Sequence, residues 1–108
     1  MRKGEIWLVD LFGGAGREQL GERPAIILAS TPLQIVAIIP LTANLKALRF
    51  PFVFPIDPNK KNGLRTQSVA LVFHVRAIDE RRLVKKIGEL DKRDIDQINH
   101  ILKKMLDL

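Results

Sequence analysis

The stretch that decides the fold is residues 21–42, Gly-Glu-Arg-Pro-Ala-Ile-Ile-Leu-Ala-Ser-Thr-Pro-Leu-Gln-Ile-Val-Ala-Ile-Ile-Pro-Leu-Thr. It holds two uncharged apolar runs, residues 24–30 and 33–41, rich in isoleucine. Such runs are typical of buried strands. The break between them, at Ser30-Thr31-Pro32, is short. The sequence therefore predicts a tight antiparallel hairpin.

Two polar residues flank this hairpin. Arg23 precedes the first run and Thr42 follows the second. A strand core fixes where its ends lie, so both side chains are expected at one rigid rim. The guanidinium is always charged and its planar fork fits phosphate, while a hydroxyl can donate a hydrogen bond. The alternatives are an ion pair between Arg23 and Glu18 or Glu22, and a threonine chosen for its strand propensity.

Outward from the hairpin, the chain predicts a small β-rich domain spanning residues 1–108. Five to seven short strands are expected, finished by a C-terminal helix. The expected elements are strands over 5–12, 66–73 and 75–79, an edge segment over 52–54 between two prolines, a glycine-rich loop over 13–22, a turn over 57–63, and a helix over 91–108.

The helix is predicted from apolar residues three and four positions apart, with Asp91 at its N-cap. His100 falls on the opposite, polar face. The apolar inventory of so short a chain predicts a homodimer. Either the helix face or a strand edge near Pro51 is expected to meet the second copy. The residues of that helix face are Ile95, Ile98, Leu102 and Met105.

The net charge of +6 is concentrated just after Thr42. Residues 42–65 contain five basic side chains and only one acidic side chain, Asp57. A basic cluster favours nucleic acid as partner, and a generic solvated surface is the alternative. The five are Lys46, Arg49, Lys60, Lys61 and Arg65. The chain has no cysteine, which excludes disulfides and thiolate metal sites. With no apolar run near the length of a membrane span, a soluble cytoplasmic protein is expected.

Several ordered motifs resemble the MazF/PemK toxins of bacterial toxin–antitoxin systems. Residues 4–10, Gly-Glu-Ile-Trp-Leu-Val-Asp, look like the opening strand of that family. Residues 16–24, Gly-Arg-Glu-Gln-Leu-Gly-Glu-Arg-Pro, look like its G-x-E-Q-x-G-x-R-P signature. Thr42 stands where the family has a threonine after its third strand, and residues 68–71 and 75–83 resemble its late strands.

The resemblance implies an SH3-like β-barrel with helices, built as a homodimer. It also implies an endoribonuclease that cuts single-stranded RNA at short sequences without metal or other cofactor. A cognate antitoxin with an acidic tail would cover the RNA groove. On this resemblance Arg23, Thr42 and Glu18 are the candidate catalytic residues. The candidate RNA contacts are Gln19, Phe12 and the five basic residues after Thr42.

Three residue choices depart from the family pattern. Residues 13–15 are Gly-Gly-Ala where proline is common, the hairpin turn at Thr31-Pro32 is short, and His74 replaces a common glutamine. His74 is expected at the start of a late strand, in a structural role. Two rival functions remain: a CcdB-like gyrase poison that is not an enzyme, and a plain nucleic-acid-binding barrel. The Arg-Pro and threonine pair speaks against the gyrase poison.

Overall fold

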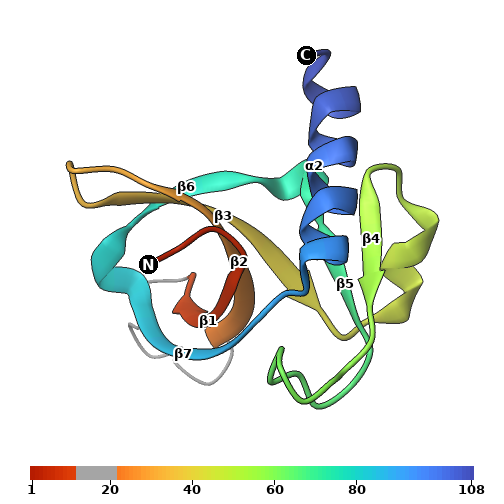
Figure 1. The fold of residues 1–108 in the computed structure, drawn as a ribbon, viewed down its shortest axis with the longest axis horizontal. Coiled ribbons are helices and arrows are strands. Elements are labelled where there is room, and N and C mark those ends of the chain that lie inside the picture. Colours follow the sequence, from red (N-terminus) through yellow and green to blue (C-terminus); the bar gives the residue numbers. More distant parts are fainter. Residues whose placement is uncertain (12–21) are drawn as a thin grey trace.

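The computed structural model describes residues 1–11 and 22–108 (Figure 1). Seven strands, three 3₁₀-helices and one α-helix make up this part of the chain. In chain order they are β1 (Glu5–Asp10), β2 (Glu22–Ser30), β3 (Ile35–Thr42), η1 (Leu45–Arg49), β4 (Val53–Ile56), β5 (Ser68–Leu71), η2 (Val72–His74), β6 (Arg76–Asp79), η3 (Glu80–Arg82), β7 (Leu83–Glu89) and α2 (Lys92–Leu106).

The strands form one curved sheet in the order β4-β5-β3-β2-β1-β7, with β6 also paired to β3. All pairs are antiparallel, and β2 and β3 form the predicted hairpin. Among the described residues β4 and β7 stay as separate edges. The mainly β fold with a C-terminal helix is thus confirmed, but the sheet is curled rather than closed into a barrel (Figure 1).

Alternation along the strands sends side chains into two apolar clusters, one on each face of the sheet. Ile26 of β2 joins the larger cluster with Ile6, Ile39, Leu41 and Ile98. Ala25 and Ile27 join the smaller cluster with Val9, Val36 and Ile38. Because β2 and β3 contribute residues to both clusters, packing on both faces of the sheet holds their ends in position.

Helix α2 covers the larger cluster. Ile98 is buried, and Ile95, Leu102 and Met105 pack against the same core. The predicted helix face is therefore covered by its own chain, which leaves the strand edge near Pro51 as the expected meeting place for a second copy. Asp91 stands at the predicted N-cap position, but its side chain makes no capping hydrogen bond. His100 is exposed, as predicted.

Two strand predictions were wrong. The run over 66–73 is a strand only over β5, because residues 72–74 turn into η2. Residues 83–89 form β7, although no strand was predicted there from the residues themselves. β7 is an edge strand whose middle residues Val84, Lys85 and Lys86 are all exposed. The sequence of β7 therefore lacks the alternation of apolar and polar residues that is typical of a half-buried strand.

The described residues contain no helix long and apolar enough to cross a membrane.

Candidate functional site

The hairpin brings Arg23 and Thr42 to one end of the sheet. Ala25 and Pro40 form the outermost pair between β2 and β3, and Arg23 and Thr42 each stand two residues beyond it. Arg23 pairs with Val9 of β1, and directly opposed residues point to the same face of a sheet. For Arg23 that is the face of the smaller apolar cluster, to which Val9 contributes. Arg23 is exposed and Thr42 is half-buried. The two residues therefore lie at the same end of the hairpin, as the sequence predicted.

Thr42 is held by the turn that follows it. The backbone N–H of Asn44 donates to Thr42 Oγ1 at 3.1 Å. The Asn44 side chain in turn accepts from the Lys46 N–H at 3.0 Å and caps η1. Because the Thr42 oxygen acts as acceptor for Asn44, its own hydroxyl hydrogen can still be donated. This is the property needed to bind a phosphate oxygen.

Thr42 also lines an open pocket of about 600 Å³ between η1, the end of β3 and the β5–η2 segment. We call it the η1 pocket. Its charged or polar lining comes from Lys46, Arg49, Asn44 and His74, and its aromatic lining from Phe50 and Phe73. The remaining lining residues are Ala47, Pro51 and Leu71.

The aromatic side of the η1 pocket is a stacked series. The Phe50 and Phe73 rings meet edge to face at 5.8 Å between centroids, and Phe73 meets the His74 ring at 4.6 Å. The Arg49 guanidinium carbon lies 5.5 Å from the Phe50 ring centroid. Cations beside aromatic rings can hold phosphate and base together, because bases stack on such rings.

The 3₁₀ geometry of η1 explains why its basic residues line the pocket. Side chains three positions apart in a 3₁₀-helix lie on the same side. Lys46 and Arg49 are therefore on one side and line the pocket, whereas Leu45 and Leu48 are on another side and are exposed. Ala47 is buried between them.

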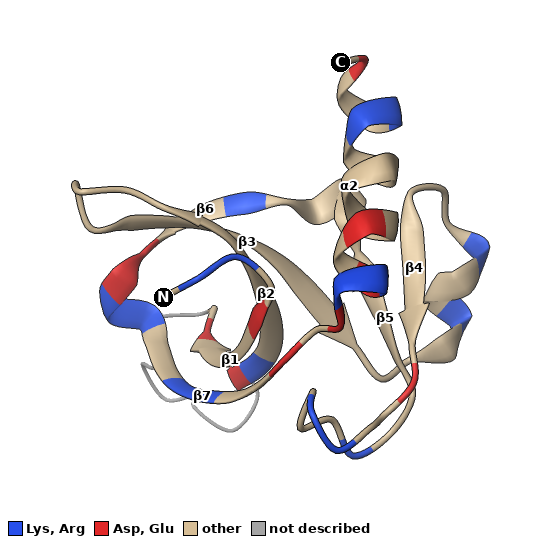
Figure 2. Ribbon diagram, viewed as in Figure 1, with Lys and Arg blue, Asp and Glu red and all other residues tan. Residues whose placement is uncertain are grey.

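The other three predicted basic contacts lie on the loop between β4 and β5. Figure 2 shows the η1 group beside β4 and the loop group beyond the lower end of this strand. Lys60 is exposed, whereas Lys61 forms an ion pair with Asp91 at 3.8 Å. Arg65 lines a second hollow, of about 370 Å³, together with Pro24 and Lys85. Arg65 thus lies beside the strand that contains Arg23, while Lys61 is engaged with the start of α2.

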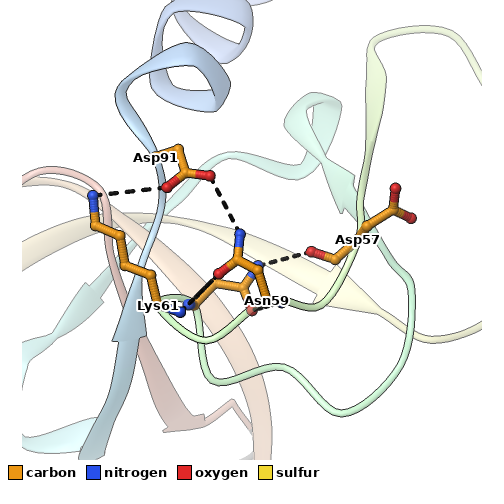
Figure 3. A network of polar contacts seen from close by, with 5 residues as sticks. Asp57, Asn59, Lys61 and Asp91 are labelled. Carbon is orange, nitrogen blue, oxygen red and sulfur yellow. Dashed lines mark hydrogen bonds and ion pairs between the residues drawn. The ribbon is translucent and has the colours of Figure 1, made fainter.

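The β4–β5 loop is braced from inside (Figure 3). Asn62 is fully buried, and its side chain accepts from the Asn59 and Leu64 N–H groups and donates to the Asp57 carbonyl. The Asn59 amide donates to the Asp91 carboxylate at 3.2 Å. Gly63 has a φ of +72°, and an added Cβ would collide with the backbone of Ile87. The loop is therefore pressed onto β7 in one fixed shape.

Phe12, Glu18 and Gln19 lie outside the described residues. The sequence pattern does not single out every residue of the η1 pocket. His74 was predicted at a strand start in a structural role, but it lies in η2, is exposed and lines the pocket with Thr42. Phe50 directly follows Arg49 in the sequence, whereas nothing in the local pattern singles out Phe73.

Asp79 and Asp94 are two of the acidic groups with shifted pKa values, and neither lines the η1 pocket. The Arg81 side chain and then its backbone N–H hold the pKa of Asp79 down at about 2. Burial raises the pKa of Asp94, which lies beside the Asp91 end of the β4–β5 loop network. Arg93 opposes this shift, while the Asp91 and Asp57 carboxylates add to it.

Comparison with known proteins gives the class. Residues 2–106 match the family described as PemK-like, MazF-like toxin of type II toxin-antitoxin system. The chain belongs to this family, which confirms the resemblance and does not favour a gyrase poison.

Among individual proteins, the chain is 32% identical to Endoribonuclease EndoA of Bacillus subtilis (strain 168), over all of this chain and 96% of that protein. Its fold is similar to that of MazF from Deinococcus radiodurans, with a TM-score of 0.76, 24% identity, and coverage of 100% and 97% of the two chains. It is also similar to a mycobacterial endoribonuclease solved with its cognate antitoxin, with a TM-score of 0.71, 16% identity, and coverage of 100% and 94%.

Proposed function

We propose that this chain is the toxin of a type II toxin–antitoxin pair and cuts single-stranded RNA without a metal ion, using the 2′-hydroxyl of the RNA as nucleophile. The observation that carries the proposal is the antiparallel hairpin, which leaves Arg23 and Thr42 each two residues beyond its outermost pair, at the same end. The family and the endoribonuclease relative support the same activity. An RNA substrate implies action in the cytoplasm.

In this mechanism the 2′-oxygen attacks the adjacent phosphorus, the bond to the 5′-oxygen breaks, and a 2′,3′-cyclic phosphate remains. Arg23 grips two phosphate oxygens and stabilises the extra negative charge of the transition state. It is unsuited to act as a base, because guanidinium keeps its proton in proteins. Thr42 donates its hydroxyl hydrogen to the phosphate and fixes its orientation, while Asn44 holds the Thr42 oxygen.

The residues outside the described part keep their sequence-based roles. Glu18 accepts the proton of the 2′-hydroxyl or holds Arg23 in place, Gln19 reads a base edge, and Phe12 stacks on a base. RNA is proposed to run from the η1 pocket, past the rim, toward Arg65. Lys46 and Arg49 then contact it in the pocket and Lys60 outside it.

We propose that the protein works as a homodimer joined at the η1 end. Leu45, Leu48 and Phe52 are 46%, 42% and 40% exposed, and they lie next to the unpaired edge of β4. An exposed apolar patch beside an open strand edge favours pairing with a second copy. Because the η1 pocket adjoins this patch, a second copy would border the RNA site.

The proposed partner in regulation is an antitoxin with an acidic tail. The support is chemical: the surplus of basic residues after Thr42 suits a polyanion, whether RNA or an acidic peptide. The mycobacterial endoribonuclease of similar fold was solved with its cognate antitoxin. Both ligands would compete for the same basic surface.

The testing experiment incubates the protein with a long mixed RNA in excess chelator. We expect discrete fragments that end in 2′,3′-cyclic phosphate, and no cut where the attacking sugar is 2′-deoxy. Arg23→Ala should lower the rate about 10²–10³-fold, the usual cost of one preorganised charge donor. Arg93→Ala is the matched control, because Arg93 is an exposed residue of α2, and it should leave the rate unchanged.

Three outcomes would contradict the proposal. RNA that is bound but intact would indicate a plain binding protein. Activity that disappears in chelator and returns with magnesium would show that the mechanism is wrong. A folded Arg23→Ala protein with an unaltered rate would remove Arg23 from the site.

A further inference from the structure

The RNA-cleaving step needs a group that hands a proton to the departing 5′-oxygen. An alkoxide is a poor leaving group, so a proton donor at this atom contributes typically about 10²–10⁴-fold in rate. Arg23 holds its proton too firmly for efficient transfer. The Thr42 hydroxyl is a weaker acid than an imidazolium and is occupied with the phosphate.

We infer that His74 is this proton donor, a catalytic residue of the η1 pocket. The inference rests on the proposed RNA cleavage and assigns one further role within it. Its basis is placement: His74 is exposed, and it lines the same pocket as Thr42. Imidazole is the side chain best suited to exchanging protons near neutral pH.

The ring is held for this task rather than free on the surface. Phe73 meets it edge to face at 4.6 Å, and Phe73 itself packs on Phe50 at 5.8 Å. The η2 backbone is pinned as well, since the Val75 N–H donates to the Val72 carbonyl and the Phe73 N–H donates to the Phe52 carbonyl. His74 is thus fixed relative to the η1 wall of the pocket.

The charges that face the pocket suit a donor beside a phosphate. Lys46 and Arg49 of η1 line it, and none of its described lining residues is acidic. A phosphate drawn in by these cations would lie next to the ring.

The proton balance of the step is simple. The 2′-oxygen attacks phosphorus and its proton passes to water or to a carboxylate. As the bond from phosphorus to the 5′-oxygen breaks, the 5′-oxygen takes the ring proton of His74. Neutral His74 then regains a proton from water. No oxidant, metal or further reactant is needed.

A pair of substrates tests this directly. One RNA carries the ordinary 5′-oxygen at the cut site. The other carries a bridging 5′-sulfur, which leaves as a thiolate and needs no proton. We expect His74→Gln to cut the ordinary RNA about 10²-fold or more slowly under saturating conditions, and the sulfur substrate at close to the wild-type rate. His100→Gln is the matched control, because His100 is exposed on α2, and it should match the wild type on both substrates.

The wild-type protein offers a second measurement that does not depend on a variant folding. Since the donor must be protonated, the rate on ordinary RNA should fall as pH rises, and this fall should be absent with the sulfur substrate. An equal loss on both substrates in His74→Gln would mean that His74 only binds RNA, and overturns the inference. An unchanged rate of His74→Gln on the ordinary RNA would also overturn the inference. A wild-type protein that cuts neither RNA would instead refute the proposed function, and this inference with it.

Discussion

The two basic groups that precede and follow β4 in the chain differ in the contacts that already hold them. At the β4–β5 loop, buried Asn62 ties the loop to itself, and Lys61 is paired with Asp91. At η1, Lys46 and Arg49 face an open pocket, and Leu45 and Leu48 face solvent. Charge alone therefore does not mark a binding surface. The η1 group is the more informative one, because its charged side chains face an open pocket instead of stabilising the chain's own loop.

The largest effect is expected where the η1 end meets a second copy. Leu48→Lys removes an apolar contact and buries a charge, and in a symmetric dimer each change occurs twice. Losing about 1.5–3 kcal/mol per buried leucine predicts a dissociation constant raised by at least about 10²-fold. Sedimentation or light scattering across a dilution series measures it.

The matched control is Leu33→Lys, in the β2–β3 turn. Leu33 is 80% exposed and lies away from the patch, so the dimer should persist. A wild-type protein that is monomeric at micromolar concentration would rule out the dimer altogether.

The next largest effect is expected from a comparison of two asparagines, Asn62 in the β4–β5 loop and Asn44 at the start of η1. Asn62→Ala leaves two N–H groups and one carbonyl without their partner in a packed loop, and should cost about 2–4 kcal/mol of unfolding free energy. Asn44→Ala removes one cap from exposed η1 and should cost about 1 kcal/mol. Urea denaturation compares them. Equal costs would mean that the loop is no better braced than η1.

The salt dependence of RNA binding separates the two lysines of the loop. Each phosphate contact on single-stranded RNA contributes about −0.7 to the log–log slope. Lys60→Ala should remove about one such contact, and Lys61→Ala less, because Lys61 is already paired with Asp91. The double variant should cut at the same sites, since phosphate contacts carry no base information, and should bind an acidic antitoxin more weakly. If neither the slope nor the antitoxin affinity changes, these lysines only keep the loop soluble.

The smallest effect concerns Asp79. Like the Asn62 side chain, the Asp79 side chain accepts hydrogen bonds within its own turn, but this turn is exposed to solvent. The Asp79 pKa of about 2 lies below its ordinary value, so its contribution to stability is complete above about pH 4 and is lost as pH falls toward 2. NMR titration should find the low midpoint, and Arg81→Ala should raise it. Because the pair is exposed, the change in stability should be small. An unshifted midpoint in Arg81→Ala would show that the backbone N–H alone sets the pKa.

The sequence predicted the hairpin and its rim because that information is local. Two uncharged runs and a short turn are enough to place Arg23 and Thr42 at the same end of the hairpin. It failed at His74 and β7 because their environments are made by distant partners. His74 lines the same pocket as Thr42 only because β5 pairs with the end of β3, and β7 is a strand only because β1 lies beside it. The motif resemblance, in contrast, indicated the family that the comparison confirms.

Two strands, β6 and β5, pair with β3, and this has a consequence for how the molecule opens. The first half of β3 pairs with β6 over Ile35–Ile38. The end of β3 pairs with β5 through only two pairs, Leu41–Ala70 and Thr42–Val69. Between these stretches stands Pro40, which has no N–H to offer. The β4–β5 unit is therefore attached mainly by packing of its side chains into the larger cluster. Amide hydrogens of β4 and β5 should exchange with solvent through a partial opening that leaves β1, β2 and β6 protected. Apolar attraction weakens on cooling, so this joint should loosen in the cold sooner than the rest of the sheet.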